Sequence, residues 1–266
     1  MSDILTQLCA HAIERVEAAK AAVPLSEMRE AALLQNCNTG FPFREALRKE
    51  GMSFICECKK ASPSKGLIAN DFPYVEIARD YEAAGASAIS VLTEPKWFLG
   101  SLEYLKEISE NVTIPVLRKD FTVDEYMIYE AKANGASAVL LIVSVLDDSQ
   151  LSEYLQITHE LGMDALVEAH DEEEIERAVK TGAKIIGVNN RNLRDFTVDI
   201  TNSTRLRSRV PENILFVAES GIRTRKDIEV LEQGKINGVL IGESLMRAEN
   251  RKQMLEELKG LKGEKK

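Results

Sequence analysis

The feature that most constrains this chain is a regular alternation of short apolar runs, rich in β-branched residues, with longer charged segments of helical periodicity. Such alternation is typical of a parallel sheet whose strands are joined by helical crossovers. Eight runs follow one another at intervals of roughly 20 to 35 residues, which favours a closed (β/α)8 barrel over an open doubly wound sheet. The predicted strands are Ser53–Cys58, Ala88–Thr93, Pro115–Arg118, Ala138–Val143, Asp164–Glu168, Lys184–Asn189, Ile214–Ala218 and Gly238–Ile241. We therefore predict an α/β fold, a single (β/α)8 TIM barrel.

Chain length and a short internal repeat agree with this interpretation. The chain has 266 residues, close to the ~250 of one barrel. The sequence Gly85–Ile89 recurs almost unchanged as Gly135–Val139, as expected where a glycine ends each helix in the left-handed conformation before the next strand. Gly162, Gly182 and Gly234 are predicted to act in the same way.

About 50 residues precede the first predicted strand. They contain two helical patterns, Ile4–Ala22 and Pro42–Lys49, separated by turn-forming residues. We expect residues 1–50 to form an N-terminal helical cap that belongs to the same domain as the barrel of residues 51–266.

Composition narrows the class of partner. Lys plus Arg total 34 and Asp plus Glu total 43, a formal net charge of -9, so no nucleic-acid partner is expected. The four cysteines lack paired CxxC spacing, and no apolar run approaches the ~18 residues of a membrane span. We expect a cytoplasmic protein with reduced thiols and no membrane contact, and a monomer as the simplest default.

Side-chain parity predicts a reactive mouth at the carboxyl ends of the strands, where active sites of barrels form. Alternate residues of a strand face inward. On this basis Cys56 and Cys58 face the helices, which is more probable than a metal pair in the absence of further ligands. The inward series end in polar residues that should converge on one cavity: Glu57, Lys59, Lys119, Glu168, Asn189 and Glu219.

Crowding of these groups in a pocket that is partly shielded from water should change their pKa values. Loss of water lowers the pKa of a lysine and raises that of a glutamate, so both should move toward neutrality. The sequence therefore predicts acid–base chemistry.

The last two strands end in small residues. Gly221 and Gly242 lie where a strand opens into a helix, so backbone N–H groups there can approach a phosphate. Because the Glu243 carboxylate would repel this anion, we expect its side chain to point away. The loop Ala61–Gly66 is a candidate active-site flap, and Phe98 and Phe121 are candidate walls for a flat ligand.

The residues of the mouth carry a family resemblance. Residues 57–66, ECKKASPSKG, closely resemble the signature of indole-3-glycerol phosphate synthases. Further matching segments follow in family order along nearly the whole chain, and the N-terminal extension is similar to the helical cap of that family. The segments are LTE at 92–94, RKDF at 118–121, LLIV at 140–143, GVNNRNL at 187–193, ESGI at 219–222 and IGESLM at 241–246.

The resemblance implies a carboxy-lyase of tryptophan biosynthesis that uses no cofactor and no metal. Its substrate is 1-(2-carboxyphenylamino)-1-deoxyribulose 5-phosphate, and its product is indole-3-glycerol phosphate. By carry-over at matching positions, Lys119 is the general acid and Glu168 its counterpart, with Lys59 as a possible second acid. Glu57 and Asn189 orient Lys119, and Glu219 positions Lys119 or a substrate hydroxyl.

The resemblance also implies the substrate contacts. Arg191 and Ser62 are expected near the substrate carboxylate. Ser220, Gly221, Gly242 and Glu243 are expected near the phosphate, and Phe98, Phe121, Leu140 and Leu193 around the ring.

Two other functions stay open on the residues alone. A desolvated lysine is also a nucleophile, so an aldolase-like barrel that forms a Schiff base on Lys119 or Lys59 is one alternative. A phosphate-ligand sensor without turnover is the other, although the intact Lys119 and Glu168 argue against it.

Overall fold

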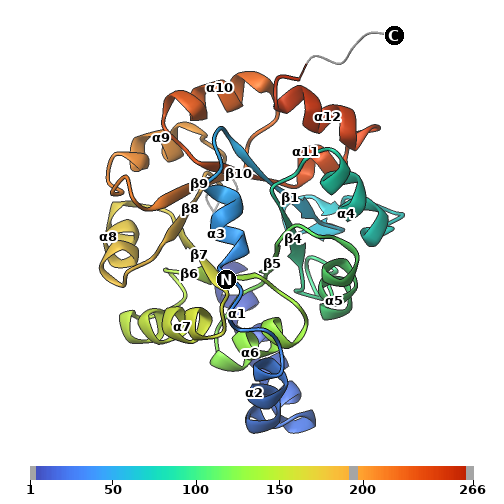
Figure 1. Cartoon of the computed structure of the whole chain (residues 1–266), viewed down its shortest axis with the longest axis vertical. Helices are drawn as coiled ribbons and strands as arrows, with labels where there is room; N and C mark the ends of the chain where they lie inside the picture. The colour runs from blue at the N-terminus through green and yellow to red at the C-terminus, as the bar shows by residue number, and fades with distance from the viewer. Residues whose placement is uncertain (1–3, 192–196, 262–266) are drawn as a thin grey trace.

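Eight parallel strands close into a barrel in the computed structural model, which describes residues 4–191 and 197–261 (Figure 1). The barrel strands follow one another in chain order, and β1 closes the barrel by pairing with both β10 and β4. Between β1 and β4 the chain forms a separate antiparallel pair, β2 (Ala61–Ser62) and β3 (Gly66–Leu67). The strands are β1 (Ser53–Cys58), β4 (Ala88–Leu92), β5 (Val116–Lys119), β6 (Ala138–Ile142), β7 (Asp164–Ala169), β8 (Ile185–Asn189), β9 (Leu215–Glu219) and β10 (Gly238–Ile241). The predicted fold is confirmed, and each predicted strand boundary lies within one residue of the observed one.

Helices on the outer face join consecutive barrel strands, and the last two helices follow β10. They are α4 (Tyr74–Ala83), α5 (Leu102–Asn111), α6 (Glu125–Ala133), α7 (Asp148–Glu160), α8 (Glu172–Lys180), α9 (Thr201–Arg207), α10 (Arg225–Gln233), α11 (Glu243–Met246) and α12 (Arg251–Leu258). Side-chain caps start several of them, as where Asp171 accepts a hydrogen bond from the backbone of Glu174 at the start of α8. Within the described ranges, no helix combines the length and apolar character that crossing a membrane requires.

Strand parity separates two apolar cores. Ile55, Leu117 and Leu166 lie inside the barrel, whereas Phe54, Cys56 and Cys58 pack in the layer between strands and helices. The inward and outward assignments of the predicted strands are therefore confirmed.

Glycines end several helices as expected, with one exception. Gly85 and Gly135 have φ values of 81° and 83° and each follows the C-cap of its helix. At the end of α10, Gly234 is itself the C-cap with φ -76°, and Lys235 takes the left-handed conformation with φ 56°. The prediction for Gly234 was wrong because α10 continues one residue further than the glycine spacing indicated.

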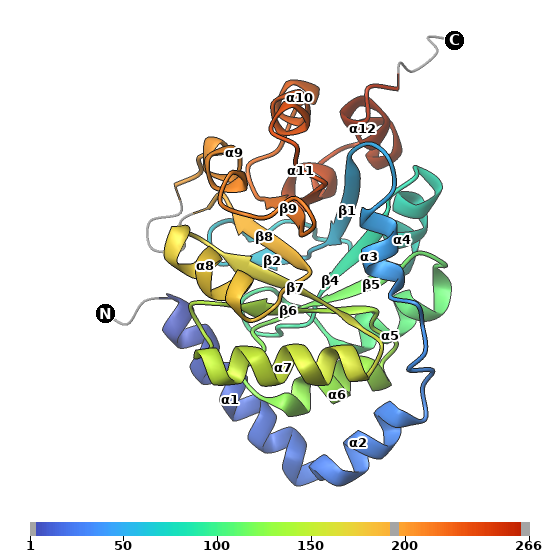
Figure 2. The same cartoon turned by 60° about the vertical axis from the view of Figure 1, so that its left-hand side comes forward.

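The helices of the N-terminal extension lie in different places. They are α1 (Ile4–Ala22), α2 (Leu25–Leu33), which the sequence patterns did not predict, and α3 (Pro42–Leu47). Helix α1 reaches the pocket end of the barrel, and α3 lies at the opposite end. Phe43 and Leu47 of α3 join the core inside the barrel, and Figure 1 shows α3 across the barrel axis. Figure 2 shows α1 and α2 beside α6. Because α1 and α3 both bury side chains against the barrel, we propose that residues 1–50 and 51–266 form one domain.

Candidate active site

A single pocket at the carboxyl ends of the strands collects the predicted polar residues. Leu193 lies outside the described residues, so its position is not assigned. The other predicted site residues all line this pocket: Glu57, Lys59, Ser62, Phe98, Lys119, Phe121, Leu140, Glu168, Asn189, Arg191, Glu219, Ser220, Gly221, Gly242 and Glu243. They come from all eight barrel strands or the loops that follow them, which agrees with the location of active sites in barrels.

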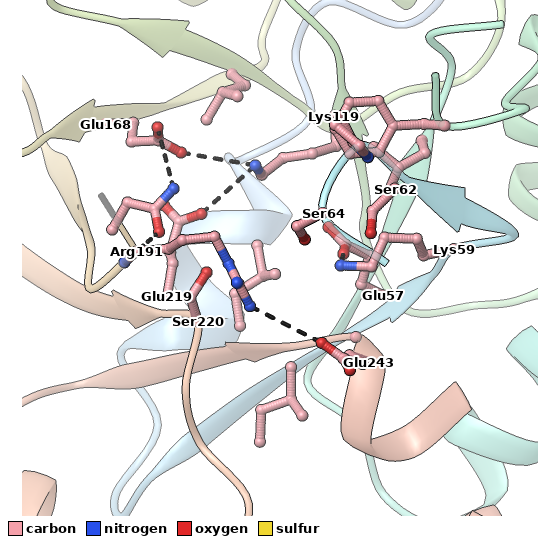
Figure 3. Close-up of a pocket in the computed structure, with 18 of the residues that line it drawn as sticks. Glu57, Lys59, Ser62, Ser64, Lys119, Glu168, Arg191, Glu219, Ser220 and Glu243 are labelled. Carbon is pink, nitrogen blue, oxygen red and sulfur yellow. Dashed lines mark hydrogen bonds and ion pairs between the residues drawn. The ribbon is translucent and has the colours of Figure 1, made fainter. Parts of the chain in front are cut away.

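Lys119 lies between two carboxylates from other strands. Its Nζ is 3.5 Å from Oε2 of Glu219 and 3.6 Å from Oε2 of Glu168 (Figure 3). The amide of Asn189 donates to Oε1 of Glu168 at 3.5 Å and accepts the backbone N–H of Arg191 at 3.0 Å. This second bond fixes which end of the Asn189 amide faces Glu168.

The charge states of this cluster differ from the expectation that all would approach neutrality. Burial lowers the pKa of Lys119, but Glu219, Glu168 and Glu57 together outweigh it, so the pKa lies above its usual value. Burial raises the pKa of Glu168, but the charge of Lys119, together with His170 and Asn189, outweighs it and brings the pKa to about 2. That prediction was therefore wrong for Lys119 and Glu168, because a close opposite charge dominates desolvation here.

Glu219 behaves as the sequence argument expected. Burial raises its pKa, and the neighbouring carboxylates Glu168 and Glu57 add to the shift, so the pKa is about 8 despite the charge of Lys119. Its Oε1 is buried without a hydrogen-bond partner among the described residues. At neutral pH the pocket therefore holds a protonated Lys119, an ionised Glu168 and a mainly protonated Glu219.

Gly187 of β8 makes room for Glu219. A Cβ added at this glycine would lie 2.3 Å from Oε1 of Glu219 and 3.1 Å from Cδ1 of Leu166. We expect Gly187→Ala to displace the Glu219 carboxylate from Lys119, to lower the free energy of unfolding by about 1–3 kcal/mol and to reduce turnover.

Thermal unfolding and steady-state kinetics would measure both effects. Gly234→Ala is the matched control, because its added Cβ meets a threonine methyl group, Cγ2 of Thr204, at 3.0 Å on the outside of the barrel. Parent-like turnover of Gly187→Ala would show that the position of Glu219 is not critical.

A second ion pair stands on the β1 side of the pocket. Lys59 Nζ is 2.7 Å from Oε1 of Glu57, and Ser90 Oγ donates to Oε2 of Glu57 at 3.3 Å. Burial opposes ionisation of Glu57, but the charges of Lys59 and Lys119 keep its pKa below its usual value. The predicted rise was therefore wrong for Glu57 too. Figure 3 shows this pair on the same side of the pocket as Ser62 and Ser64.

The loops after β9 and β10 form the other end of the pocket. Ser220 and Gly221 both have positive φ values, 68° and 84°, and Ser244 Oγ donates to the carbonyl of Ile222 at 2.9 Å, which ties the two loops together. Gly242 has no room for a side chain, since a Cβ would lie 2.5 Å from Oε1 of Glu57.

Glu243 does not turn away from the pocket, contrary to the prediction. Its carboxylate oxygens are 3.8 Å from Arg191, 3.8 Å from Lys65 and 3.4 Å from Arg247, and Figure 3 shows the pair with Arg191. Three cations partly neutralise this carboxylate, which removes the repulsion on which the prediction rested.

An apolar wall faces the charged groups. The rings of Phe98 and Phe121 are 6.2 Å apart at an angle of 40°, and Leu140 of β6 also lines the pocket. Glu94 holds the loop of Phe98 in place, since its buried carboxylate accepts the backbone N–H groups of Lys96, Trp97 and Phe98 at 3.0, 2.7 and 3.0 Å.

The contribution of α1 to the pocket was not predicted from the sequence. Ile4 and Leu8, one helical turn apart, line the pocket. Their i, i+4 spacing marks an apolar face, but nothing in the sequence indicates where that face docks. Polar contacts hold α1 there, above all Arg15, whose guanidinium makes two hydrogen bonds to Asp120 at 2.7 and 3.0 Å.

His170 was also not predicted from the sequence. It lies two residues after Glu168, directly after the end of β7. Its Nε2 is 3.3 Å from Oε1 of Glu168. Strand parity was the available signal, because a residue two positions on from an inward Glu168 also faces inward.

In the part of the chain that the structure describes, no group of three or more His, Cys, Asp or Glu side chains is arranged to hold a metal ion. Cys56 and Cys58 are buried beside Tyr81 in the outer layer, and burial raises the pKa of both thiols. The packing assignment made from parity is therefore confirmed for these two cysteines.

Solved structures with the same barrel fold align with this chain at low sequence identity. The chain aligns with a thiamine phosphate pyrophosphorylase from Pyrococcus furiosus at a TM-score of 0.61 and 18% identity, covering 82% of this chain and 96% of that one. A 3-hexulose-6-phosphate synthase aligns at a TM-score of 0.65 and 14% identity, covering 80% and 100%. These likenesses show the barrel fold and nothing about the reaction.

Sequence relatives are much closer. The model of the indole-3-glycerol phosphate synthase family matches residues 5–258. A protein of that name from Endomicrobium trichonymphae is 55% identical over 256 residues, covering 96% of this chain and 99% of the relative. Another from Ruminiclostridium cellulolyticum is 54% identical over 258 residues, covering 97% and 99%. The chain described here therefore belongs to the indole-3-glycerol phosphate synthase family.

Proposed function

We propose that this chain converts 1-(2-carboxyphenylamino)-1-deoxyribulose 5-phosphate into indole-3-glycerol phosphate, releasing carbon dioxide and water. The observation that carries the proposal is a half-buried ammonium group, Lys119, held between the buried carboxylates of Glu168 and Glu219 in a pocket with an aromatic wall. The reaction needs a proton donor at a ketone and a stabilising anion nearby, and this arrangement offers both.

Ring closure is the step assigned to Lys119. The ring carbon that bears the carboxylate attacks the ketone carbon, and Lys119 Nζ gives its proton to the ketone oxygen, which becomes a hydroxyl group. Positive charge develops on the ring nitrogen during this step. The ionised Glu168 and the other carboxylates favour the positive charge on the ring nitrogen. Because the pKa of Lys119 is raised, its ammonium group is protonated at neutral pH and can donate the proton.

Two further steps complete the indole. The carbon–carboxylate bond breaks, carbon dioxide leaves, and its electron pair restores the aromatic ring and neutralises the nitrogen. The hydroxyl group then leaves as water after gaining a proton, while a base removes a proton from the adjacent carbon. We assign the acid to Lys59 or Lys119 and the base to Glu168 or Glu57, since these coupled groups exchange protons as a unit.

The two ends of the pocket suit the two ends of this substrate. Backbone N–H groups of the Ser220–Gly221 and Gly242–Glu243 segments are proposed to bind the phosphate. Arg191 and Ser62 are proposed to bind the substrate carboxylate, with Phe98, Phe121 and Leu140 around the ring. A Glu243 carboxylate already paired with cations is compatible with a phosphate beside it.

A fluorescence assay tests the proposed function. Indole fluorescence should appear when the carboxyphenylamino sugar phosphate is added to the parent protein. Tight binding of this substrate without turnover would instead favour the phosphate-ligand sensor.

Borohydride treatment tests the aldolase-like alternative. A Schiff base requires an unprotonated amine, and the raised pKa of Lys119 opposes that form. We therefore expect no stable lysine adduct by mass spectrometry after reduction in the presence of substrate. A stoichiometric adduct on Lys119 would reverse the assignment.

A further inference from the structure

We propose that His170, as an imidazolium clamped between Glu174 and Glu168, is a positioning residue that keeps Glu168 ionised and aims one of its oxygens at Lys119. This inference rests on the proposed function only through the importance of Glu168 for turnover. The clamp itself is a property of the free protein.

The two carboxylate oxygens of Glu168 face different partners. Oε1 faces His170 Nε2 at 3.3 Å and Asn189 at 3.5 Å, whereas Oε2 faces Lys119 Nζ at 3.6 Å. Glu168 and Nε2 of His170 are both almost completely removed from solvent. Nε2 contacts Oε1 as an ion pair, since the contact lacks hydrogen-bond geometry. The positive charge beside Oε1, together with the Asn189 amide that donates to it, therefore favours one orientation of the carboxylate and so the position of Oε2.

Glu174 clamps the other side of the imidazole. Its Oε2 is 2.9 Å from Nδ1 of His170 and also accepts the backbone N–H of His170 at 2.8 Å. The start of α8 sets this arrangement, because Asp171 caps the helix and places Glu174 on the third helical position, one turn from His170. Glu174 thus contacts both the side chain and the main chain of His170.

Two carboxylates on the two ring nitrogens favour the doubly protonated ring, because each nitrogen then needs a hydrogen to donate. Burial lowers the pKa of His170, but the bonds and charges of Glu168 and Glu174 outweigh it and bring the pKa to about 10. Lys119 is the next charge beyond Glu168, and α9 contributes the neutral amide of Asn202, which faces the His170 carbonyl at 3.4 Å.

The consequence for Glu168 follows from the sign of the nearest charges. A cation at Oε1 favours the ionised form, and its removal raises the pKa of Glu168. A neutral replacement also removes the charge that attracts Oε1 and leaves the longer Asn189 contact of 3.5 Å, so the carboxylate is held less firmly toward Lys119. Loss of His170 should therefore act on turnover and on its pH dependence more than on substrate binding.

Three variants test the proposal. His170→Gln keeps an N–H donor but removes the charge, and Glu174→Gln removes one of the two anions that sustain it. His159→Gln is the matched control, since that histidine lies at the end of α7 against Phe41. Thermal unfolding of each variant separates loss of fold from loss of function.

NMR measures the charge states of His170 and Glu168 independently of enzymatic turnover. In the parent protein, nitrogen NMR should show an imidazolium at His170 at pH 8, and carbon NMR should show Glu168 ionised down to below pH 4. In His170→Gln the titration of Glu168 should move up by at least about 1 pH unit. A neutral His170 at pH 7, or an unmoved Glu168 titration, would overturn the proposal.

Kinetics give the second readout. For His170→Gln we expect kcat to fall about 10-fold or more, KM to stay within about 2-fold, and the acid limb of kcat/KM to move to higher pH, with a smaller shift for Glu174→Gln. A uniform loss of kcat with an unchanged pH profile would show a merely structural role and contradict the proposal. A parent protein that forms no indole would refute the proposed function, while the NMR titrations would still decide on the clamp.

Discussion

Lys119→Met is expected to lower kcat by about 10²–10⁴-fold, because it removes the group proposed to protonate the ketone. Methionine keeps a similar length and an apolar stem, so substrate affinity should change much less than kcat. The parent and the variant would be compared by the rise of indole fluorescence at saturating substrate.

The same change should alter stability in a pH-dependent way. The pKa of Lys119 is raised in the folded protein, so its contribution to stability is fully present at neutral pH and disappears only as pH rises beyond the usual lysine range. Without this cation the buried Glu168, Glu57 and Glu219 lose their shared partner. We therefore expect Lys119→Met to unfold more easily near pH 8 than near pH 5, where the carboxylates can take up protons.

Lys184→Met is the control for Lys119→Met. Lys184 is exposed and directly precedes β8 at the opposite end of the barrel, so it undergoes the same chemical change without contact with the pocket. Turnover of Lys119→Met within about threefold of the parent would contradict the role of general acid.

Glu168→Gln is the second substitution with a large expected effect. It keeps the shape of the side chain but removes the charge that faces Lys119 and one of the two bases proposed for dehydration, so kcat should fall by about 10²-fold or more. The pKa of Glu168 is held at about 2, which means that the parent carboxylate is ionised throughout the range from pH 4 to 9. The loss should therefore have a similar size across this range.

Glu168→Asp separates the charge from its position. It keeps a carboxylate but draws it back from Lys119, and an intermediate rate is expected. Glu153→Gln on the exposed face of α7 controls for the removal of one negative charge. Unchanged turnover in Glu168→Gln would exclude proton transfer or charge stabilisation by this residue.

Much of the barrel could be read from local pattern. Alternation along a strand assigns each residue to the inner or outer face, and parallel strands in a barrel bring their carboxyl ends together. These two rules placed Glu57, Lys119, Glu168 and Glu219 in one pocket. The family signature beside Glu57 then supplied a reaction that local pattern alone left open among three alternatives.

Docking of distant segments could not be read in the same way. The extension was expected to act as one cap, yet α3 fills the far end of the barrel while Ile4 and Leu8 of α1 reach the pocket. An apolar helical face shows that a helix is buried but not against which partner. The positions of these helices depend on long-range contacts such as Arg15 with Asp120.

The sequence by itself thus determined the strands, their facing and the chemical groups at the mouth, because a two-residue period and a short motif are properties of neighbouring residues. Only the tertiary structure decided the charge states: Lys119 stays protonated, Glu168 ionised and Glu219 mainly neutral at pH 7. Coulomb energy depends on the separation of side chains from different strands. Separations of 3.3–3.6 Å among Lys119, Glu168, Glu219 and His170 exist only once the barrel has closed.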